Sequence, residues 1–204
     1  VGGYERVFEL NRNFRNEGLS KTHNPEFTML EAYQAWSDRR GMQDLVQALI
    51  TDVARQVCGT LQVGPPDAPL DLAPPWREVA YRDLLRETAG ADWFDLPLDE
   101  ARRRAERLAL APDPSWTHAQ VTHEIYEKVI ERTLRAPTFV TRLPRDLVPL
   151  ARTCDDAPDT VDVFELVIDG KEIAPGYSEL NDPREQRRRF EQQAGEDRQA
   201  IDEE

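Results

Sequence analysis

Cysteine, basic residues and long apolar stretches are all scarce in this sequence. Its two cysteines, Cys58 and Cys154, lie far apart and without the close spacing of a metal-binding pair, so two reduced thiols are expected. The 26 lysines and arginines face 39 acidic residues, giving a formal charge of −13. This balance argues against a non-specific nucleic-acid clamp, because phosphate binding needs clustered basic side chains. No apolar run approaches the roughly 20 residues of a membrane-spanning helix, so no membrane partner is predicted.

The first residues, Val1-Gly2-Gly3-Tyr4-Glu5, include no methionine and lack the basic-then-apolar order of a signal peptide. They lead directly into a strand-like stretch. We therefore expect a fragment of a longer, cytoplasmic protein. Its 204 residues suit one domain or a large part of one.

Residues 4–36 form two halves rich in strand-forming side chains, joined by the polar stretch 18–25. Alternating patterns on either side of a polar loop predict a long antiparallel hairpin.

The middle of the chain has helical character. Apolar residues recur at helical spacing over 45–57, and Gly59 is a plausible stop. After a proline-rich connector, shorter amphipathic segments follow at 81–88 and 99–110, and a further helix is predicted from Thr117 to about Leu134.

Strands return in the last part of the chain. Two strand-like segments, 161–169 and 171–180, flank Asp169-Gly170, and Asp-Gly is the pair that a two-residue type I′ hairpin turn prefers. Hairpin, helices and hairpin in this order predict an α+β domain on an antiparallel sheet.

The final helix is predicted from Asp182-Pro183-Arg184-Glu185, which supplies an N-cap, a proline at the first helical position and a capping glutamate. The whole chain is then one partial domain. Its expected segments are a hairpin and helix (1–58), a connector with helices (59–136), and a hairpin with a terminal helix (137–204).

A pair of carboxylates is predicted on the second hairpin. The turn at Asp169-Gly170 places Val167 opposite Glu172, so Glu165 lies one diagonal step away on the same face, at roughly 7–8 Å. Such a pair suits Mg²⁺, which takes few protein carboxylates and completes its shell with phosphate and water. The alternative is the solvent-facing side of an ordinary amphipathic hairpin.

The stretch Ala174-Pro175-Gly176 interrupts this pattern, because proline within a strand favours an edge or a bulge. A bulge would change the phase of the strand and bring Glu179 onto the face of Glu165. The resulting anionic pocket would attract a metal or a ligand ammonium group.

The first hairpin carries a second candidate group. Phe27, Glu31 and Tyr33 are separated by even numbers and so share a strand face. They could bind a planar ligand and an amine, or form half of an ordinary core with one exposed acid. Arg15 is a candidate anion clamp, or an edge-strand arginine in water. His23 fits an ordinary loop histidine.

Several strings resemble the class II lysyl-tRNA synthetases, and in the same order. Motif 2 of that family is matched by Phe14-Arg15-Asn16-Glu17 and by His23-Asn24-Pro25-Glu26-Phe27-Thr28-Met29-Leu30-Glu31, and later matches are Pro137-Thr138-Phe139-Val140-Thr141, Phe164-Glu165-Leu166 and Ser178-Glu179-Leu180-Asn181-Asp182. The resemblance covers nearly the whole chain and is weakest between about 60 and 115.

The resemblance implies a catalytic core with an inserted helical segment that condenses ATP and lysine to lysyl-adenylate and then charges tRNA(Lys). Arg15 would be the catalytic residue, holding the ATP α-phosphate and the lysine carboxylate. The other implied ligands of ATP are Glu17, His23, Asn24 and Phe27; those of lysine are Glu31, Tyr33 and Glu179; those of Mg²⁺ are Glu165 and Glu172. A homodimer is implied for the full-length protein.

The departures from the family pattern are also informative. Pro175 replaces the usual asparagine, and Tyr177 a usual phenylalanine. Motifs 1 and 3 and an anticodon-binding barrel are absent from this stretch, so this polypeptide is expected to be inactive alone. Two alternatives remain: a paralogue that attaches lysine to elongation factor P, and a non-catalytic remnant that binds a nucleotide or a protein.

Overall fold

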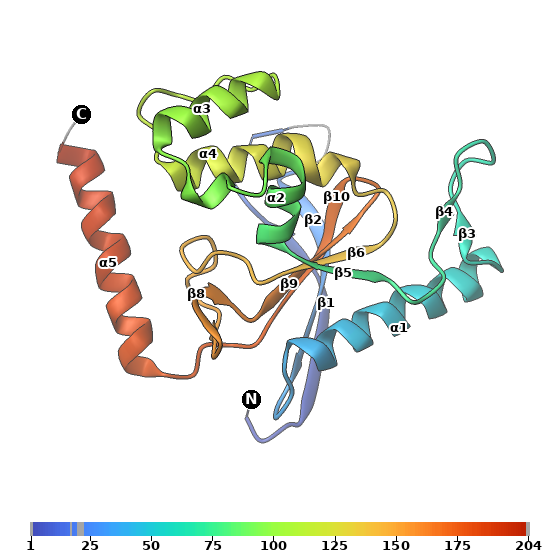
Figure 1. Cartoon of the computed structure of the whole chain (residues 1–204). Coiled ribbons are helices and arrows are strands. Elements are labelled where there is room, and N and C mark those ends of the chain that lie inside the picture. The colour runs from blue at the N-terminus through green and yellow to red at the C-terminus, as the bar shows by residue number, and fades with distance from the viewer. Residues whose placement is uncertain (1, 17, 20–22, 203–204) are drawn as a thin grey trace. The chain divides into compact units, whose positions relative to one another are not determined.

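The computed structural model of the chain describes residues 2–16, 18–19 and 23–202 (Figure 1). The chain divides into two compact units, Val1–Ser37 and Asp38–Glu204. Within the described residues, no helix combines the length and the apolar character needed to cross a membrane.

The first unit contains the predicted antiparallel hairpin, formed by β1 (Arg6–Phe14) and β2 (Glu26–Gln34). Its register runs without a bulge from Arg6 opposite Gln34 to Phe14 opposite Glu26. Side chains on a regular strand alternate between its two faces. Because the register is continuous, Phe27, Glu31 and Tyr33 lie on the same face of β2.

The second unit is built on a four-stranded sheet in the order β10–β9–β6–β5. Its strands are β5 (Arg77–Ala80), β6 (Thr138–Thr141), β9 (Val163–Ile168) and β10 (Lys171–Tyr177). The α+β class is confirmed, but the sheet is mixed rather than wholly antiparallel, because β5 and β6 are parallel. Helices connect these two strands, and a crossover of that length is what a parallel pair requires.

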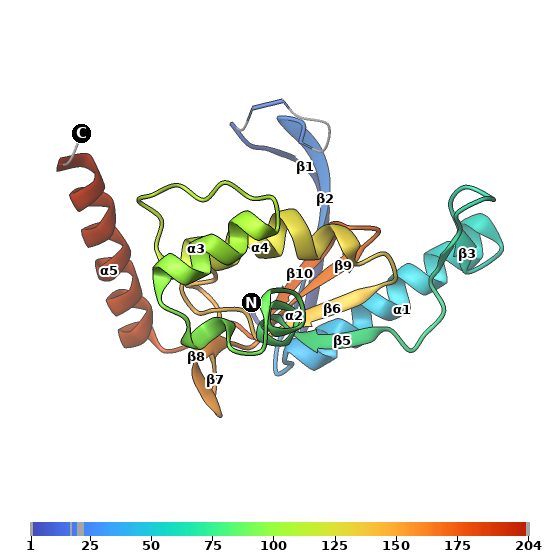
Figure 2. The same cartoon turned by 45° about the horizontal axis from the view of Figure 1, so that its top comes forward.

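Helices cover both faces of this sheet (Figures 1 and 2). On one face, α1 (Arg39–Cys58) packs apolar side chains such as Val46 and Ile50 against Phe139 and Phe164. The other face carries Val140, Val163 and Val167 and belongs to the larger core under the helical layer. That layer comprises α2 (Tyr81–Ala89), η1 (Trp93–Asp95), α3 (Leu98–Arg107) and α4 (His118–Ile125).

Local signals place the ends of these helices. Asp38 caps α1 by accepting a hydrogen bond from the Gly41 N–H at 3.0 Å, and Gly59 ends it with φ 70°. Thr117 and Gln120 form a capping box at the start of α4. The end at Gly59 and the start at Thr117 agree with the predicted boundaries, whereas α1 begins six residues before the apolar spacing that predicted it, which starts at Leu45.

The helix predicted from Thr117 to Leu134 is not continuous. After Ile125 it widens into a π-helical turn, η2 (Tyr126–Ile130), and then tightens into a 3₁₀ turn, η3 (Glu131–Thr133). A π turn accommodates one extra residue through an i→i+5 hydrogen bond. The apolar spacing in the sequence does not reveal that residue, so the prediction was wrong here.

The β9–β10 hairpin turns at Asp169-Gly170, where both residues have positive φ, 51° and 69°. Val167 faces Glu172, as predicted. The bulge lies between Glu172 and Ala174, slightly earlier than the predicted site, and it brings Pro175 opposite Glu165.

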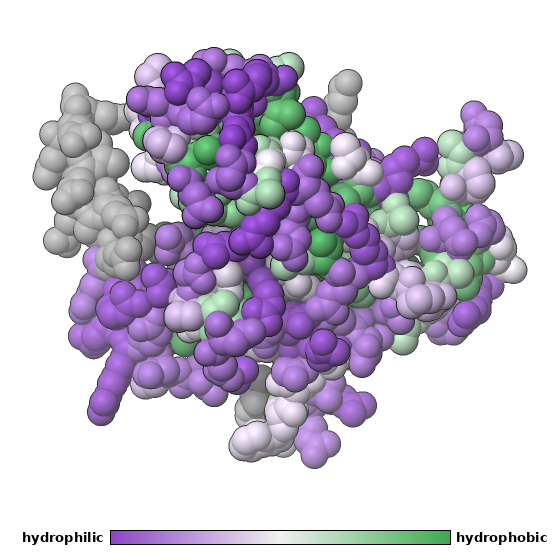
Figure 3. Space-filling view, in the orientation of Figure 1, coloured by the Kyte–Doolittle hydropathy of each residue, from purple (hydrophilic) through white to green (hydrophobic). Residues whose placement is uncertain are grey.

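Short hairpins and a terminal helix complete the second unit. The strands are β3 (Gln62–Val63), β4 (Leu70–Asp71), β7 (Thr153–Cys154) and β8 (Ala157–Val161), and the helix is α5 (Pro183–Asp202). The Asp182 carboxylate accepts from the Arg184 N–H at 2.9 Å, which confirms the predicted N-cap. Most of the face in Figure 3 is hydrophilic, as a chain with 32% charged residues requires.

Candidate functional site

The hairpin of the first unit brings a cation and an aromatic ring together. Arg15 directly follows β1, and its N–H donates to the Pro25 carbonyl at 3.0 Å. Its guanidinium carbon lies 5.3 Å from the centre of the Phe27 ring, within the range of a cation–π contact. Across the turn, the Asn24 amide donates to the Glu26 carbonyl at 2.9 Å and holds the start of β2.

The remaining candidates of this unit differ in exposure. Glu31 is half-buried and lies directly opposite Glu9, and Tyr33 is exposed. Two carboxylates facing each other across a strand pair repel, which favours a cationic guest between them. His23 lies in the exposed turn, and Glu17 lies outside the described residues.

The β9–β10 hairpin of the second unit carries the predicted carboxylates. Glu165 lies between Val163 and Val167 on β9 and therefore faces the helical layer. The hydroxyl of Tyr126, in the π turn, donates to Glu165 Oε2 at 3.1 Å. Burial, followed by repulsion from Glu172, raises the pKa of Glu165 to about 7, against the opposing effect of that hydrogen bond.

Glu131 is a further carboxylate of this cluster. Its Oε1 accepts a hydrogen bond from the backbone N–H of Glu172 at 3.1 Å. Burial raises the pKa of Glu131, the Glu172 N–H opposes that shift, and the charges of Glu172 and Glu127 add to it. The carboxylates thus destabilise one another's charged forms.

Glu179 belongs to the same electrostatic neighbourhood. Burial and then the charges of Glu172, Glu165 and Glu179 raise the pKa of Tyr177 on β10. Glu165, Glu172 and Glu179, the three carboxylates that the sequence predicted to converge, therefore all contribute to the raised pKa of Tyr177. The bulge in β10 supplies the required change of phase.

Glu165 and Glu172 fit a divalent cation whose remaining ligands come from phosphate and water. Within the described part of the chain, no three acidic, histidine or cysteine side chains form a ready-made metal-binding group. Glu165 and Glu172 supply two carboxylates with mutual repulsion that a cation would relieve. Mg²⁺ characteristically uses one or two carboxylates and completes its shell with phosphate and water.

Sequence reasoning missed Tyr126 and Glu131. Both lie in a stretch whose apolar residues predicted an ordinary helix, and their contacts depend on the π turn. The available signal was weak: Glu127 and Glu131 are acids four residues apart.

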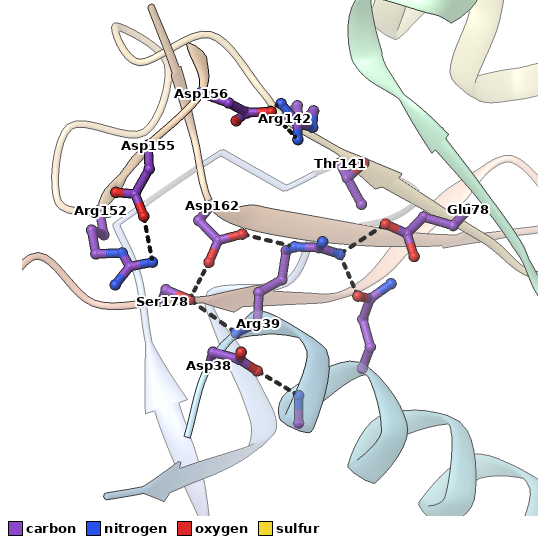
Figure 4. A network of polar contacts seen from close by, with 12 residues as sticks. Asp38, Arg39, Glu78, Thr141, Arg142, Arg152, Asp155, Asp156, Asp162 and Ser178 are labelled. Atoms are coloured by element: carbon purple, nitrogen blue, oxygen red, sulfur yellow. Dashed lines mark hydrogen bonds and ion pairs between the residues drawn. The ribbon is translucent and has the colours of Figure 1, made fainter. Parts of the chain in front are cut away.

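A polar network joins α1 to the end of β10 (Figure 4). The Arg39 N–H donates to Ser178 Oγ at 2.9 Å, and Ser178 Oγ donates to Asp162 at 2.6 Å. The Arg39 guanidinium also pairs with Asp162 at 3.0 Å and Glu78 at 3.1 Å, and it donates to Gln43. Ser178 stands between Tyr177 and Glu179, so this network fixes the segment that carries them.

The sequence matches, over residues 1–204, the family described as tRNA synthetases class II (D, K and N). The chain belongs to this family. Its relatives include proteins named lysine–tRNA ligase from Chromohalobacter salexigens, 47% identical over 198 residues, and from Moorella thermoacetica, 44% identical over 205 residues. These alignments cover 96% and 100% of this chain but 39% and 42% of the relatives, so the chain spans about two fifths of their length.

Proposed function

We propose that the full-length protein is a lysine–tRNA ligase, and that this chain supplies residues for ATP, lysine and Mg²⁺. The proposal is supported chiefly by Arg15 and Phe27, which stand together on a hairpin whose sequence resembles motif 2. The names of the relatives support the choice of lysine.

In the first reaction, an oxygen of the lysine carboxylate attacks the α-phosphorus of ATP, and the bond to pyrophosphate breaks. Lysyl-adenylate and pyrophosphate are the products, and no oxidant or covalent enzyme intermediate is needed. Arg15 would stabilise the charge that develops at the phosphorus and orient the carboxylate. Phe27 would stack on the adenine, with Glu17, His23 and Asn24 around the nucleotide.

Glu165 and Glu172 would hold Mg²⁺. When bound, the cation neutralises charge on the ATP phosphates. Glu31 would bind the α-ammonium group of lysine, and Tyr33 and Glu179 its ε-ammonium group. In the second reaction the lysyl group passes to the terminal adenosine of tRNA(Lys).

The remaining features of the proposal concern the whole protein. We place it in the cytoplasm as a homodimer, with the helices between β5 and β6 as an insertion in the class II core. This chain by itself is proposed to be inactive in aminoacylation.

Lysine-dependent exchange of pyrophosphate into ATP by the full-length protein tests the proposal. Arg15→Ala should lower this exchange roughly 100-fold or more, as the loss of one charge-stabilising donor does elsewhere. Arg12→Ala is the matched control, because Arg12 is an exposed neighbour paired with Glu26 at 3.6 Å. Nucleotide binding without lysine-dependent exchange would overturn the enzyme assignment, and charging of elongation factor P instead of tRNA(Lys) would reassign the acceptor.

A further inference from the structure

One short helical stretch contacts both carboxylate residues of the proposed metal site. Tyr126, the first residue of η2, donates through its hydroxyl to the Glu165 carboxylate at 3.1 Å. Glu131, the residue directly after η2, accepts from the Glu172 N–H at 3.1 Å. Glu165 lies on β9 and Glu172 on β10. Residues 126–131 therefore contact both strands of the hairpin, in addition to the hydrogen bonds that pair the strands with each other.

The π turn explains how Tyr126 and Glu131 can both reach the hairpin. On a regular α-helix, residues five apart point about 140° away from each other, at roughly 100° per residue. In η2 the Glu131 N–H instead bonds to the Tyr126 carbonyl, the i→i+5 pattern of a π-helix. This bond places Glu131 one turn above Tyr126, so that the side chains of both residues face the β9–β10 hairpin.

Packing holds Tyr126 in place. Its ring lies 4.8 Å from the ring of Tyr81, and the two side chains are 3% and 1% exposed. Among the residues that the structure describes, the hydroxyl of Tyr81 has no hydrogen-bond partner, whereas that of Tyr126 donates to Glu165. Tyr81 and Tyr126 are therefore adjacent in the same core, but only the hydroxyl of Tyr126 donates a hydrogen bond to Glu165.

We infer that Tyr126 and Glu131 are positioning residues that fix Glu165 and Glu172 relative to each other for a divalent cation. The inference rests on the proposed function, because it takes those two glutamates as metal ligands. The π turn is the device that brings both contacts to one side of the helix. Outer partners of this kind commonly change metal affinity by about 10- to 100-fold.

The test uses the full-length protein with Mn²⁺ as a paramagnetic probe and a non-hydrolysable ATP analogue. Tyr126→Phe removes only the donating hydroxyl and should weaken Mn²⁺ binding, followed by electron paramagnetic resonance, about tenfold. Pyrophosphate exchange should require more Mg²⁺ and recover once Mg²⁺ is saturating. Tyr81→Phe removes the neighbouring hydroxyl, which makes no hydrogen bond to Glu165, and should leave Mn²⁺ affinity unchanged.

Glu131 provides an independent pair of variants. Glu131→Ala should weaken Mn²⁺ binding, and Glu131→Gln should restore much of it, because the amide oxygen still accepts from the Glu172 N–H. The difference separates positioning from charge, since both variants remove the same charge. Unchanged melting temperatures would show that the variants fold.

The outcomes distinguish the inference from the proposed function. Wild-type affinity for Mn²⁺ in Tyr126→Phe and Glu131→Ala, with binding lost in Glu165→Gln, would overturn the positioning role alone. Wild-type affinity in Glu165→Gln would overturn the metal site and this inference together, while lysine-dependent exchange could still establish the enzyme. Weakened Mn²⁺ binding in Tyr126→Phe without any exchange by the wild type would support the positioning role and reject the ligase.

Discussion

Phe27 offers one face of its ring to the Arg15 guanidinium, and the same ring is the proposed platform for adenine. A base stacked on an aromatic side chain gains about 1–3 kcal/mol. We expect Phe27→Ala to raise the KM for ATP roughly tenfold in pyrophosphate exchange, with little change in the KM for lysine. Phe27→Tyr keeps the ring and should stay close to wild type. An equal rise in both KM values would contradict the stacking role.

Pro175 is the residue at which this chain departs most clearly from the family pattern. It lies on β10 directly opposite Glu165, at an exposed position next to the bulge. Its ring lacks the hydrogen-bond donor that an asparagine side chain would offer. Pro175→Asn should therefore leave the KM for lysine unchanged or lower it. A sharp loss of lysine-dependent exchange would show that Pro175 does not correspond to the asparagine of the family pattern.

At the scale of elements, Arg189 attaches α5 to the rest of the second unit. Its buried guanidinium donates to the carbonyls of Pro149 at 2.9 Å and Ala151 at 2.8 Å, and it pairs with Glu185 at 2.8 Å. Removing one partner of a buried charged contact costs roughly 3–5 kcal/mol. Arg189→Ala should speed amide hydrogen exchange in α5 by about a hundredfold. Arg187→Ala, which removes an exposed arginine of the same helix, should not.

Glu185 makes this attachment dependent on pH. The hydrogen bonds from Arg188 and Arg189 lower the pKa of Glu185 to about 2. Because the folded pKa lies below the unfolded one, the stabilisation is complete above about pH 4.5 and is lost as the pH falls toward 2. The carboxyl ¹³C shift of Glu185 should titrate near pH 2, and Arg188→Ala should move the midpoint upward. A midpoint near 4.5 in the wild type would contradict the pairing.

The π turn is the element that sequence periodicity did not reveal. Residues 117–134 carry apolar side chains at spacings that satisfy an α-helix, and the helix begins where predicted, directly after Thr117. The extra residue in η2 is accommodated because Tyr126 and Glu131 gain partners on the β9–β10 hairpin. Contacts between distant segments therefore decided the geometry of this helix.

At the scale of the second unit, Arg39 joins α1 to three strands or strand ends. Its side chain is 11% exposed and reaches Asp162, Glu78 and Gln43, while its backbone N–H donates to Ser178 (Figure 4). Arg39→Met would leave Asp162 without its cation and should lower the free energy of unfolding by roughly 3 kcal/mol. Arg40→Met, one residue along α1, is the control. Equal melting temperatures for the two variants would show that the network contributes nothing to stability.

The sequence by itself determined the elements whose signals are local. The Asp169-Gly170 turn fixed the register that pairs Val167 with Glu172, and Gly59 ended α1, because each depends on the backbone preferences of a few neighbouring residues. The motifs around Arg15 and Phe27 carried the family resemblance, which the family match then confirmed.

Only the tertiary structure decided what surrounds these elements. The parallel pairing of β5 with β6, the burial that raises the pKa of Glu165, and its contact with Tyr126 all join residues far apart in the sequence. Such contacts depend on how layers pack, and neither hydrophobic periodicity nor turn chemistry encodes them. The carboxylates were visible in the sequence, whereas the phenol and the π turn beside them became visible only in the fold.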